Sequence, residues 1–171
     1  MFHNLIYFSI DSTTLLRFLV IVAITLLAVW KDIKSYKIPN YLVLGGLMVS
    51  ILLLIYTFAT GGSLITYVVA GVLTFMVLVP VYLMHGIGAG DVKLLTVIGL
   101  LSGVDAMIRI IALSFLCAGL TGIVLIVSGA GGRRQIMLPN GTSARFHTMH
   151  FSISIFVAEM LTYGILVAGG C

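Results

Sequence analysis

A carboxylate follows a run of glycines near the middle of the chain. Residues 85–91 read His-Gly-Ile-Gly-Ala-Gly-Asp, and a mainly apolar stretch begins directly after Asp91. A carboxylate at membrane depth costs at least about 2.5–3.5 kcal/mol, so one that is kept there indicates a functional site. Glycines allow positive φ angles and the close approach of another chain, and both suit a site that handles a peptide bond. Asp91 is therefore the first candidate for catalysis.

A second carboxylate, Asp32, closes the first apolar stretch and precedes the segment Ile38-Pro39-Asn40. Alone, it could be a helix-end carboxylate paired with a lysine. Beside Asp91 it could do more, because two carboxylates held close and shielded from water cannot both ionise easily. The ionised one can activate water against a peptide carbonyl, while the protonated one protonates the carbonyl oxygen and later the leaving amine. The apparent pKa values would then belong to the pair and not to either carboxylate alone.

The other three acidic side chains are weaker candidates. Asp11 and Asp105 lie in or beside breaks between apolar stretches, where an ordinary solvated turn residue is the better interpretation. Glu159 lies in the middle of the last apolar stretch. Three interpretations are open: a buried hydrogen-bonding partner, a pore-lining group, or a sign that this stretch is an imperfect span. We favour a structural or supporting role for Glu159.

The composition places these carboxylates in a membrane protein. Of the 171 residues, 61% are hydrophobic and 8% are charged, and the mean hydropathy is +1.25. Soluble domains do not have this composition. The first apolar run, residues 15–30, is not followed by a small-residue cleavage site, so we expect a permanent span. Cys117 and Cys171 have no spacing typical of a disulfide framework or a zinc site.

Six apolar stretches predict an all-α, polytopic membrane fold with the glycine-aspartate loop before the fourth helix. Pro39 fits the first turn of the second helix, where its missing N–H is tolerated. Nothing indicates a repeat or a linker, so one integral-membrane domain is expected over residues 1–171. The expected helices cover about 14–31, 41–59, 64–84, 91–102, 106–128 and 151–168.

The basic residues predict the orientation. If the break at 31–40 is cytoplasmic, seven basic residues lie on that side and only Arg17 and Arg109 lie opposite, as the positive-inside rule requires. Both termini are then outside, and the 85–91 loop and the polar loop 129–150 are cytoplasmic. The net charge of +4 thus follows from topology and gives little support for nucleic-acid binding. The seven are Lys31, Lys34, Lys37, Lys93, Arg133, Arg134 and Arg145.

The fourth apolar stretch is short. Ten residues, 92–101, rise about 15 Å as a helix, half of a hydrocarbon core of about 30 Å. Either neighbouring helices shield this stretch, or Asp91 starts below the membrane surface. We expect the second, with the glycine loop dipping into the membrane edge and lining a wet cavity within the protein.

These residues match a family pattern. An Asp followed closely by Ile-Pro-Asn, and later by Gly-x-Gly-Asp-Val-Lys-Leu-Leu, resembles the type IV prepilin peptidases, which are membrane aspartyl proteases of the GxGD kind. The matching residues are Asp32, Ile38-Pro39-Asn40 and the run from Gly88 to Leu95. The resemblance covers most of the chain from about residue 14, and the six spans agree with the short members of the family.

The resemblance implies cleavage of a short, positively charged leader from pilin precursors at the cytoplasmic face of the inner membrane. Asp32 and Asp91 would be the catalytic pair, with Gly88, Gly90 and Lys93 as supporting residues of the loop. The expected partners are the prepilin substrate and the lipid bilayer, without nucleic acid, and the sequence indicates no oligomeric state. Neither a metal ion nor a nucleotide cofactor is needed for this chemistry.

The sequence departs from the long members of the family, which add a cytoplasmic region with paired cysteines and a methyltransferase activity. We therefore do not expect N-methylation. The short form resembles the peptidases that serve tight-adherence (Flp) pili and, more distantly, the archaeal preflagellin peptidases. Residues 146–151 lack the proline-aromatic entry of many relatives, so the resemblance says little about the last span and Glu159.

Local alternatives to these site residues are weaker. The three glycines of the loop have neither the spacing nor the Gly-Lys-Ser/Thr ending of a phosphate-binding loop. His147 and His150 have no further ligand placed to complete a metal site. His85 is expected to be a polar cap at a helix end rather than a catalytic group.

Two other functions compete with the peptidase. The first is a small proton- or ion-coupled transporter in which Asp32, Asp91 and Glu159 form a relay, since such relays use intramembrane carboxylates. Against it, two of the three acids share one side, and the six stretches show no evident inverted repeat. The second is a non-catalytic assembly subunit of a secretion machine.

Overall fold

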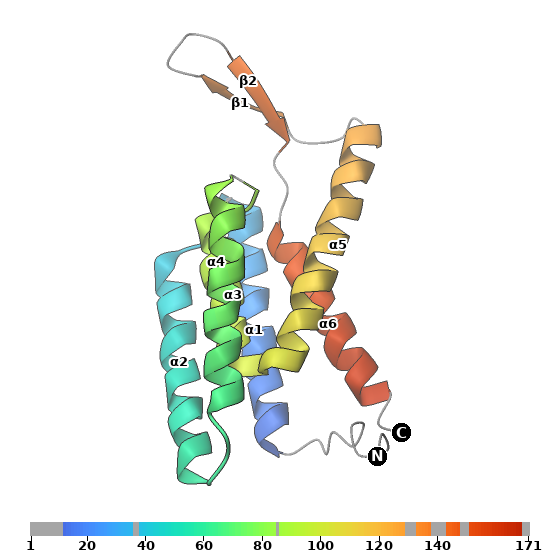
Figure 1. Cartoon of the computed structure of the whole chain (residues 1–171). Coiled ribbons are helices and arrows are strands. Elements are labelled where there is room, and N and C mark those ends of the chain that lie inside the picture. The colour runs from blue at the N-terminus through green and yellow to red at the C-terminus, as the bar shows by residue number, and fades with distance from the viewer. Residues whose placement is uncertain are drawn as a thin grey trace.

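The computed structural model describes residues 12–35, 38–84, 86–128, 133–137, 143–147 and 151–168. Within these residues the chain forms a bundle of helices with a small hairpin beyond one end (Figure 1). The predicted all-α membrane fold is thus confirmed, with the hairpin as the one departure from it. The elements are α1 (Ser12–Ser35), α2 (Asn40–Ala59), α3 (Ile65–Leu83), α4 (Ala89–Ser102), α5 (Val104–Ser128), β1 (Arg133–Met137), β2 (Ser143–His147) and α6 (Phe151–Ala168).

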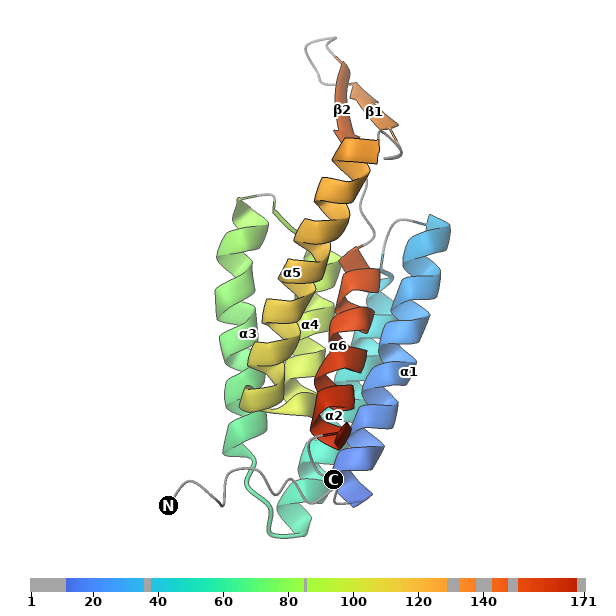
Figure 2. The same cartoon turned by 90° about the vertical axis from the view of Figure 1, so that its right-hand side faces the viewer.

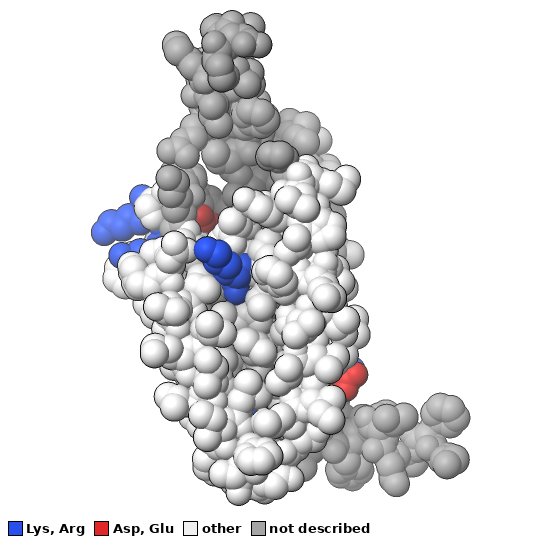
Figure 3. Space-filling model, turned by 60° about the vertical axis from the view of Figure 1, so that its left-hand side comes forward, with Lys and Arg blue, Asp and Glu red and all other residues white. Residues whose placement is uncertain are grey.

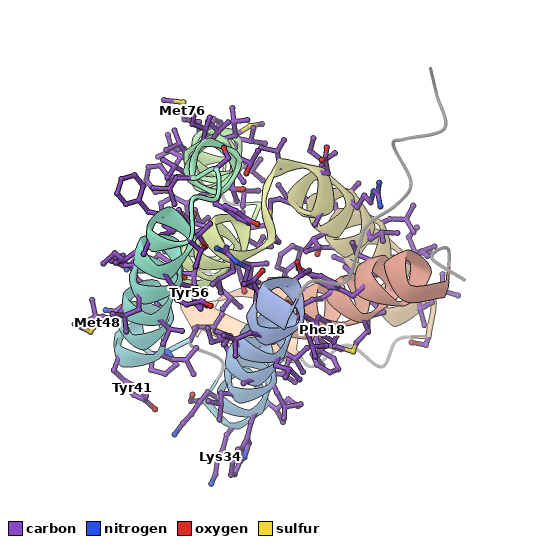
Figure 4. All side chains as sticks on the ribbon, turned by 90° about the horizontal axis from the view of Figure 1, so that it is seen from below. Phe18, Lys34, Tyr41, Met48, Tyr56 and Met76 are labelled. Atoms are coloured by element: carbon purple, nitrogen blue, oxygen red, sulfur yellow. The ribbon has the colours of Figure 1, made fainter. Side chains whose placement is uncertain are left out.

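Four of the helices, α1, α2, α3 and α5, are long and apolar enough to cross a membrane. Their outer faces carry large apolar side chains: Met48 of α2 and Met76 of α3 point away from the bundle (Figure 4). Because so many exposed apolar groups are unfavourable in water, the protein is embedded in the membrane. Helix α1 continues past the expected end at 31 to Ser35, so Asp32 lies inside the helix.

Helix α4 is the centre of the bundle. It packs against each of the other five helices, and Figure 2 shows it between α3 and α1. Leu94, Leu95 and Ile98 are completely buried. The neighbouring helices therefore shield α4, as the first of the two explanations for a short fourth helix requires. The depth of Asp91 in the membrane stays a prediction.

Small residues bring α3 and α4 close together. A Cβ placed on Gly99 would lie 2.8 Å from Thr74 Oγ1 and 3.1 Å from the Ala70 carbonyl oxygen of α3. Small residues at such contacts let helix backbones approach in the membrane, where packing rather than hydrophobic burial drives helix association. At the end of α4, Gly103 has a φ of +78° and makes the turn into α5 within one residue. This turn is shorter than the break expected before residue 106.

The loop between α5 and α6 contains an antiparallel hairpin that the sequence analysis did not predict. Strands β1 and β2 pair with Arg133 opposite His147 and Met137 opposite Ser143. The sequence carried a signal for it, because Asn140-Gly141 is typical of a tight hairpin turn. The polarity of this loop was correctly recognised, but its short strands were not.

On the face that Figure 3 shows, basic side chains gather near the hairpin end of the bundle, above a broad band of mostly uncharged surface. Lys31 and Lys34 of α1 and Lys93 of α4 are exposed at this end. Lys34 extends away from α1 (Figure 4). The positions of these side chains agree with the predicted charge asymmetry, while the side chains of Lys37, Arg133, Arg134 and Arg145 lie outside the described residues.

Arg17 was expected within the first apolar stretch, on the side opposite the other basic residues. In the structure it is only 3% exposed and lies inside the bundle, and the sequence analysis did not predict this burial. Its guanidinium donates to the carbonyl oxygens of Leu101 at 3.2 Å and Leu53 at 3.4 Å and to the Thr57 hydroxyl, and it stacks on Tyr67 at 3.8 Å from the ring centroid. Since Leu101 lies in the last turn of α4, the cation also complements the dipole of that helix.

Candidate active site

Asp32 and Asp91 come from different helices and meet at one end of the bundle. Asp32 lies in the last turns of α1 and Asp91 in the first turn of α4, and these two helix ends lie at the hairpin end (Figure 1). The two carboxylates are close enough to interact electrostatically. Both side chains are half-buried. The structure therefore brings together the two acids that the sequence analysis singled out.

A third polar group at this site was missed by the sequence analysis. The Ser152 hydroxyl of α6 donates a hydrogen bond of 2.6 Å to Asp32 Oδ2. Ser152 is only 1% exposed, so its hydroxyl is sheltered from lipid and water. The sequence did contain one indication that Ser152 faces the protein. It precedes the acidic residue Glu159 by seven positions, so the two lie on the same face of the last helix.

Gly88 and Asp91 together form the start of α4. Gly88 is the N-cap residue in an extended conformation, with φ −76° and ψ 148°. Asp91 is the third residue of the helix and its carboxylate interacts with the Gly88 backbone, as in half of a capping box. A Cβ on Gly88 would lie 3.0 Å from Asp91 Oδ2. A side chain at position 88 would therefore crowd the catalytic candidate.

The glycines of the loop before α4 do not use their freedom to adopt positive φ angles. Among the described glycines, positive φ occurs at Gly61 and Gly103 and not in this loop. The approach of a substrate chain to these glycines stays a prediction, but Gly90 does pack closely within the protein itself. A Cβ on Gly90 would lie 3.0 Å from Ile38 Cβ. The glycine is therefore required by packing against the segment before α2.

Lys93 joins the same two segments. Its ammonium group donates a hydrogen bond of 3.1 Å to Asn40 Oδ1, at the start of α2. The sequence analysis did not predict this contact, and the supporting role of Lys93 stays a prediction. Pro39 lies just before the helix as its N-cap residue, rather than in the first turn. Ile38-Pro39-Asn40 and the glycine-aspartate loop are thus one packed unit.

Glu159 lies apart from the two aspartates. It is completely buried, and its Oε2 accepts a hydrogen bond of 2.8 Å from the Thr25 hydroxyl of α1. Its Oε1 has no hydrogen-bond partner among the described residues. Of the roles considered for Glu159, a buried hydrogen-bonding partner between α1 and α6 describes its place in the structure. Asp105, expected to be a solvated turn residue, is exposed in the first turn of α5, and Asp11 lies outside the described residues.

The described residues contain no cluster of three or more His, Cys, Asp or Glu side chains that could hold a metal ion. The side chains of His85, His147 and His150, which were considered as polar or metal-binding groups, lie outside the described residues. Two carboxylates that interact electrostatically, and a serine that donates to one of them, are the polar groups that the described part of the chain brings together here. Such a pair can act on a bound water as base and acid.

The fold and the site define a polytopic helical membrane protein with a pair of acids at one end of its bundle. The family model described as the type IV leader peptidase family matches residues 19–123, which include Asp32 and Asp91. This match spans more than half of the chain, and the chain belongs to that family. No curated protein and no solved structure matches the chain.

Family membership makes the protein a prepilin peptidase of type IV pilus systems, with prepilins as its general class of substrate. The resemblance noted from the sequence is thereby confirmed at the level of the family. The matched range ends at residue 123, within α5, so α6 with Ser152 and Glu159 lies beyond it.

Proposed function

We propose that the protein is an aspartic endopeptidase that removes the basic leader of Flp-like type IV prepilins at the cytoplasmic face of the membrane. The observation that carries the proposal is the approach of Asp32 and Asp91, from two helices, at the basic end of the bundle. Flp-like precursors are the first substrates to test, because the sequence resembles the peptidases of tight-adherence pili.

In the proposed reaction the pair holds one proton. The ionised carboxylate takes a proton from water as the water oxygen bonds to the scissile carbonyl carbon, and the protonated carboxyl donates its proton to the carbonyl oxygen. The tetrahedral diol then collapses: the C–N bond breaks, the first carboxyl gives its proton to the leaving amine, and the second regains a proton from the diol. One water is consumed, and the pair returns to its starting state.

The orientation of the substrate supports the same location. A prepilin has its basic leader in the cytoplasm and its apolar helix in the bilayer, so its scissile bond lies near the membrane surface. The basic end of this bundle corresponds to the cytoplasmic side under the positive-inside rule. Lys31 and Lys34 are poor candidates for reading a basic leader because their charge has the same sign, and they are better explained as determinants of orientation.

The experiment is cleavage of a purified Flp-like prepilin by the protein reconstituted in lipid vesicles, with products identified by mass spectrometry. Wild type is expected to release the leader and the mature pilin, and Asp91→Asn is expected to release neither. Asp105→Asn is the matched control, since it makes the same isosteric change in the first turn of α5. Cleavage by Asp91→Asn at a rate close to that of Asp105→Asn would overturn the proposal.

A further inference from the structure

Helix α6 lies beyond the range that the family model matches, yet it contributes a side chain to the pair of aspartates. We propose that Ser152 is a positioning residue that holds Asp32 ready to act as the general base of the pair. This inference rests on the proposed function and assigns unequal parts to its two carboxylates.

The hydrogen bond between Ser152 and Asp32 has the geometry of a strong, charge-assisted contact. The separation of 2.6 Å between Ser152 Oγ and Asp32 Oδ2 is typical of a hydroxyl that donates to an ionised carboxylate. A donor to the charged form favours that form. The contact also fixes the rotamer of the carboxylate, which has to point at the attacking water for base catalysis.

A second hydrogen bond holds α6 in the register that this contact requires. Thr25 and Asp32 are seven residues apart on α1, and Ser152 and Glu159 are seven residues apart on α6. The two helices run in opposite directions (Figure 2), so Thr25–Glu159 at 2.8 Å and Ser152–Asp32 lie along one seam, two turns apart. A slide of α6 along α1 would break both bonds at once.

Aromatic contacts continue this seam toward the other end of the bundle. The rings of Phe18 on α1 and Tyr163 on α6 lie 4.5 Å apart between centroids, and Figure 4 shows Phe18 on the side of α1 that faces α6. The contacts of α6 with α1 therefore extend along most of the helix. Ser152 is supplied by a firmly packed helix rather than by a loop.

The titratable groups near Asp32 come from α1 and α4. Helix α4 contributes Asp91, the protonated partner in the proposed pair, and α1 itself carries Lys31 and Lys34, both exposed. The acid of α6, Glu159, is engaged by Thr25 two turns away. A change at Ser152 is therefore expected to act on Asp32 through the lost hydroxyl and not through a change of charge.

The test compares Ser152→Ala, Ser152→Thr and the control Ser154→Ala, a second buried serine of α6, in prepilin cleavage by the reconstituted protein. For Ser152→Ala we expect roughly tenfold lower kcat with little change in KM. The loss should fall on kcat rather than KM because Asp32 loses the contact that orients it, while the groups that bind substrate are unchanged. Ser152→Thr keeps a hydroxyl and should restore kcat, and Ser154→Ala should match wild type.

Wild-type kcat in folded Ser152→Ala, or a loss in Ser152→Ala that Ser152→Thr does not restore, would overturn the inference. If Ser152→Ala does not fold, Ser152→Cys replaces it, since a thiol is a weak donor of similar size; wild-type behaviour of Ser152→Cys would overturn the inference equally. Asp32→Asn in the same assay separates the two proposals. If Asp32→Asn does not cleave prepilin and Ser152→Ala cleaves it at the wild-type rate, only the inference about Ser152 fails. If Asp32→Asn itself cleaves at the wild-type rate, the proposed two-aspartate function is contradicted.

Discussion

The ammonium group of Lys93 lies 3.1 Å from Asn40 Oδ1, and this contact ties the start of α2 to the first turns of α4. The two residues belong to segments that are 53 positions apart in the chain. The same two segments meet where Gly90 packs against Ile38. The segment that follows the helix of Asp32 is therefore fixed against the helix of Asp91, and the contact helps to define the separation of the two carboxylates.

Removing the donor of this contact should lower activity without abolishing it. For Lys93→Met we expect roughly threefold to tenfold lower kcat for prepilin cleavage, because a hydrogen bond to a charged group contributes about 1 kcal/mol or somewhat more. Lys34→Met is the matched control, since it removes an exposed charge at the same end of the bundle. Equal losses in the two variants would show that charge alone matters and that the contact does not.

A methyl group at position 90 should disturb the same interface by overpacking. The Cβ of Gly90→Ala would lie 3.0 Å from Ile38 Cβ, and overpacking of this kind typically costs about 1–3 kcal/mol. We expect a lower thermal unfolding midpoint in detergent and reduced cleavage. Gly45→Ala is the control, because a Cβ there meets nothing within 4 Å. If Gly90→Ala unfolds at the same temperature as Gly45→Ala, the proposed packing is absent.

Arg17 should stabilise the end of the bundle away from the site. Replacement by Met removes the Arg17 donor from the Leu101 carbonyl oxygen, while the Leu53 carbonyl oxygen keeps the Thr57 hydroxyl as a donor. This change is expected to lower the free energy of unfolding by about 1–3 kcal/mol. Arg109, exposed on α5, provides the control Arg109→Met with a change near zero. Chemical unfolding in mixed micelles measures both. Similar values for the two variants would mean that the buried cation contributes nothing to stability.

The pH dependence of cleavage should be bell-shaped. Two adjacent carboxylates that work as base and acid are active when they hold one proton between them. At low pH both are protonated and no base is available, while at high pH both are ionised and no acid is available. Initial rates over a pH series in vesicles give the profile. A rate that rises to a plateau and stays there at high pH would show that the reaction needs no protonated carboxyl as general acid, and this would contradict the mechanism.

Much of the site followed from the sequence because carboxylates are rare in this chain. With five acidic residues, the placement of helices and loops was enough to put Asp32 and Asp91 on one side of the membrane. The glycine-aspartate string then identified the family. The helix ranges also followed from apolar runs, since a membrane span is defined mainly by its length and hydropathy.

The inward faces of the helices could not be predicted in the same way. A helix in lipid is apolar on all sides, so hydrophobic periodicity does not show which residues face the protein. The shielding of α4 and the contact between Ser152 and Asp32 depend on those faces. The burial of Arg17 was not predicted for a related reason: the sequence placed it correctly within the first helix but did not show that its side chain points into the bundle.

The most direct test of the central claim is the initial rate of prepilin cleavage by Asp32→Asn, Asp91→Asn and the double variant, measured together in vesicles. If the two carboxylates act as one unit on one water, each single variant loses nearly all activity and the double variant is no slower than either. A single variant that still cleaves at near the wild-type rate, or a double variant whose loss is the product of two modest losses, would contradict the account.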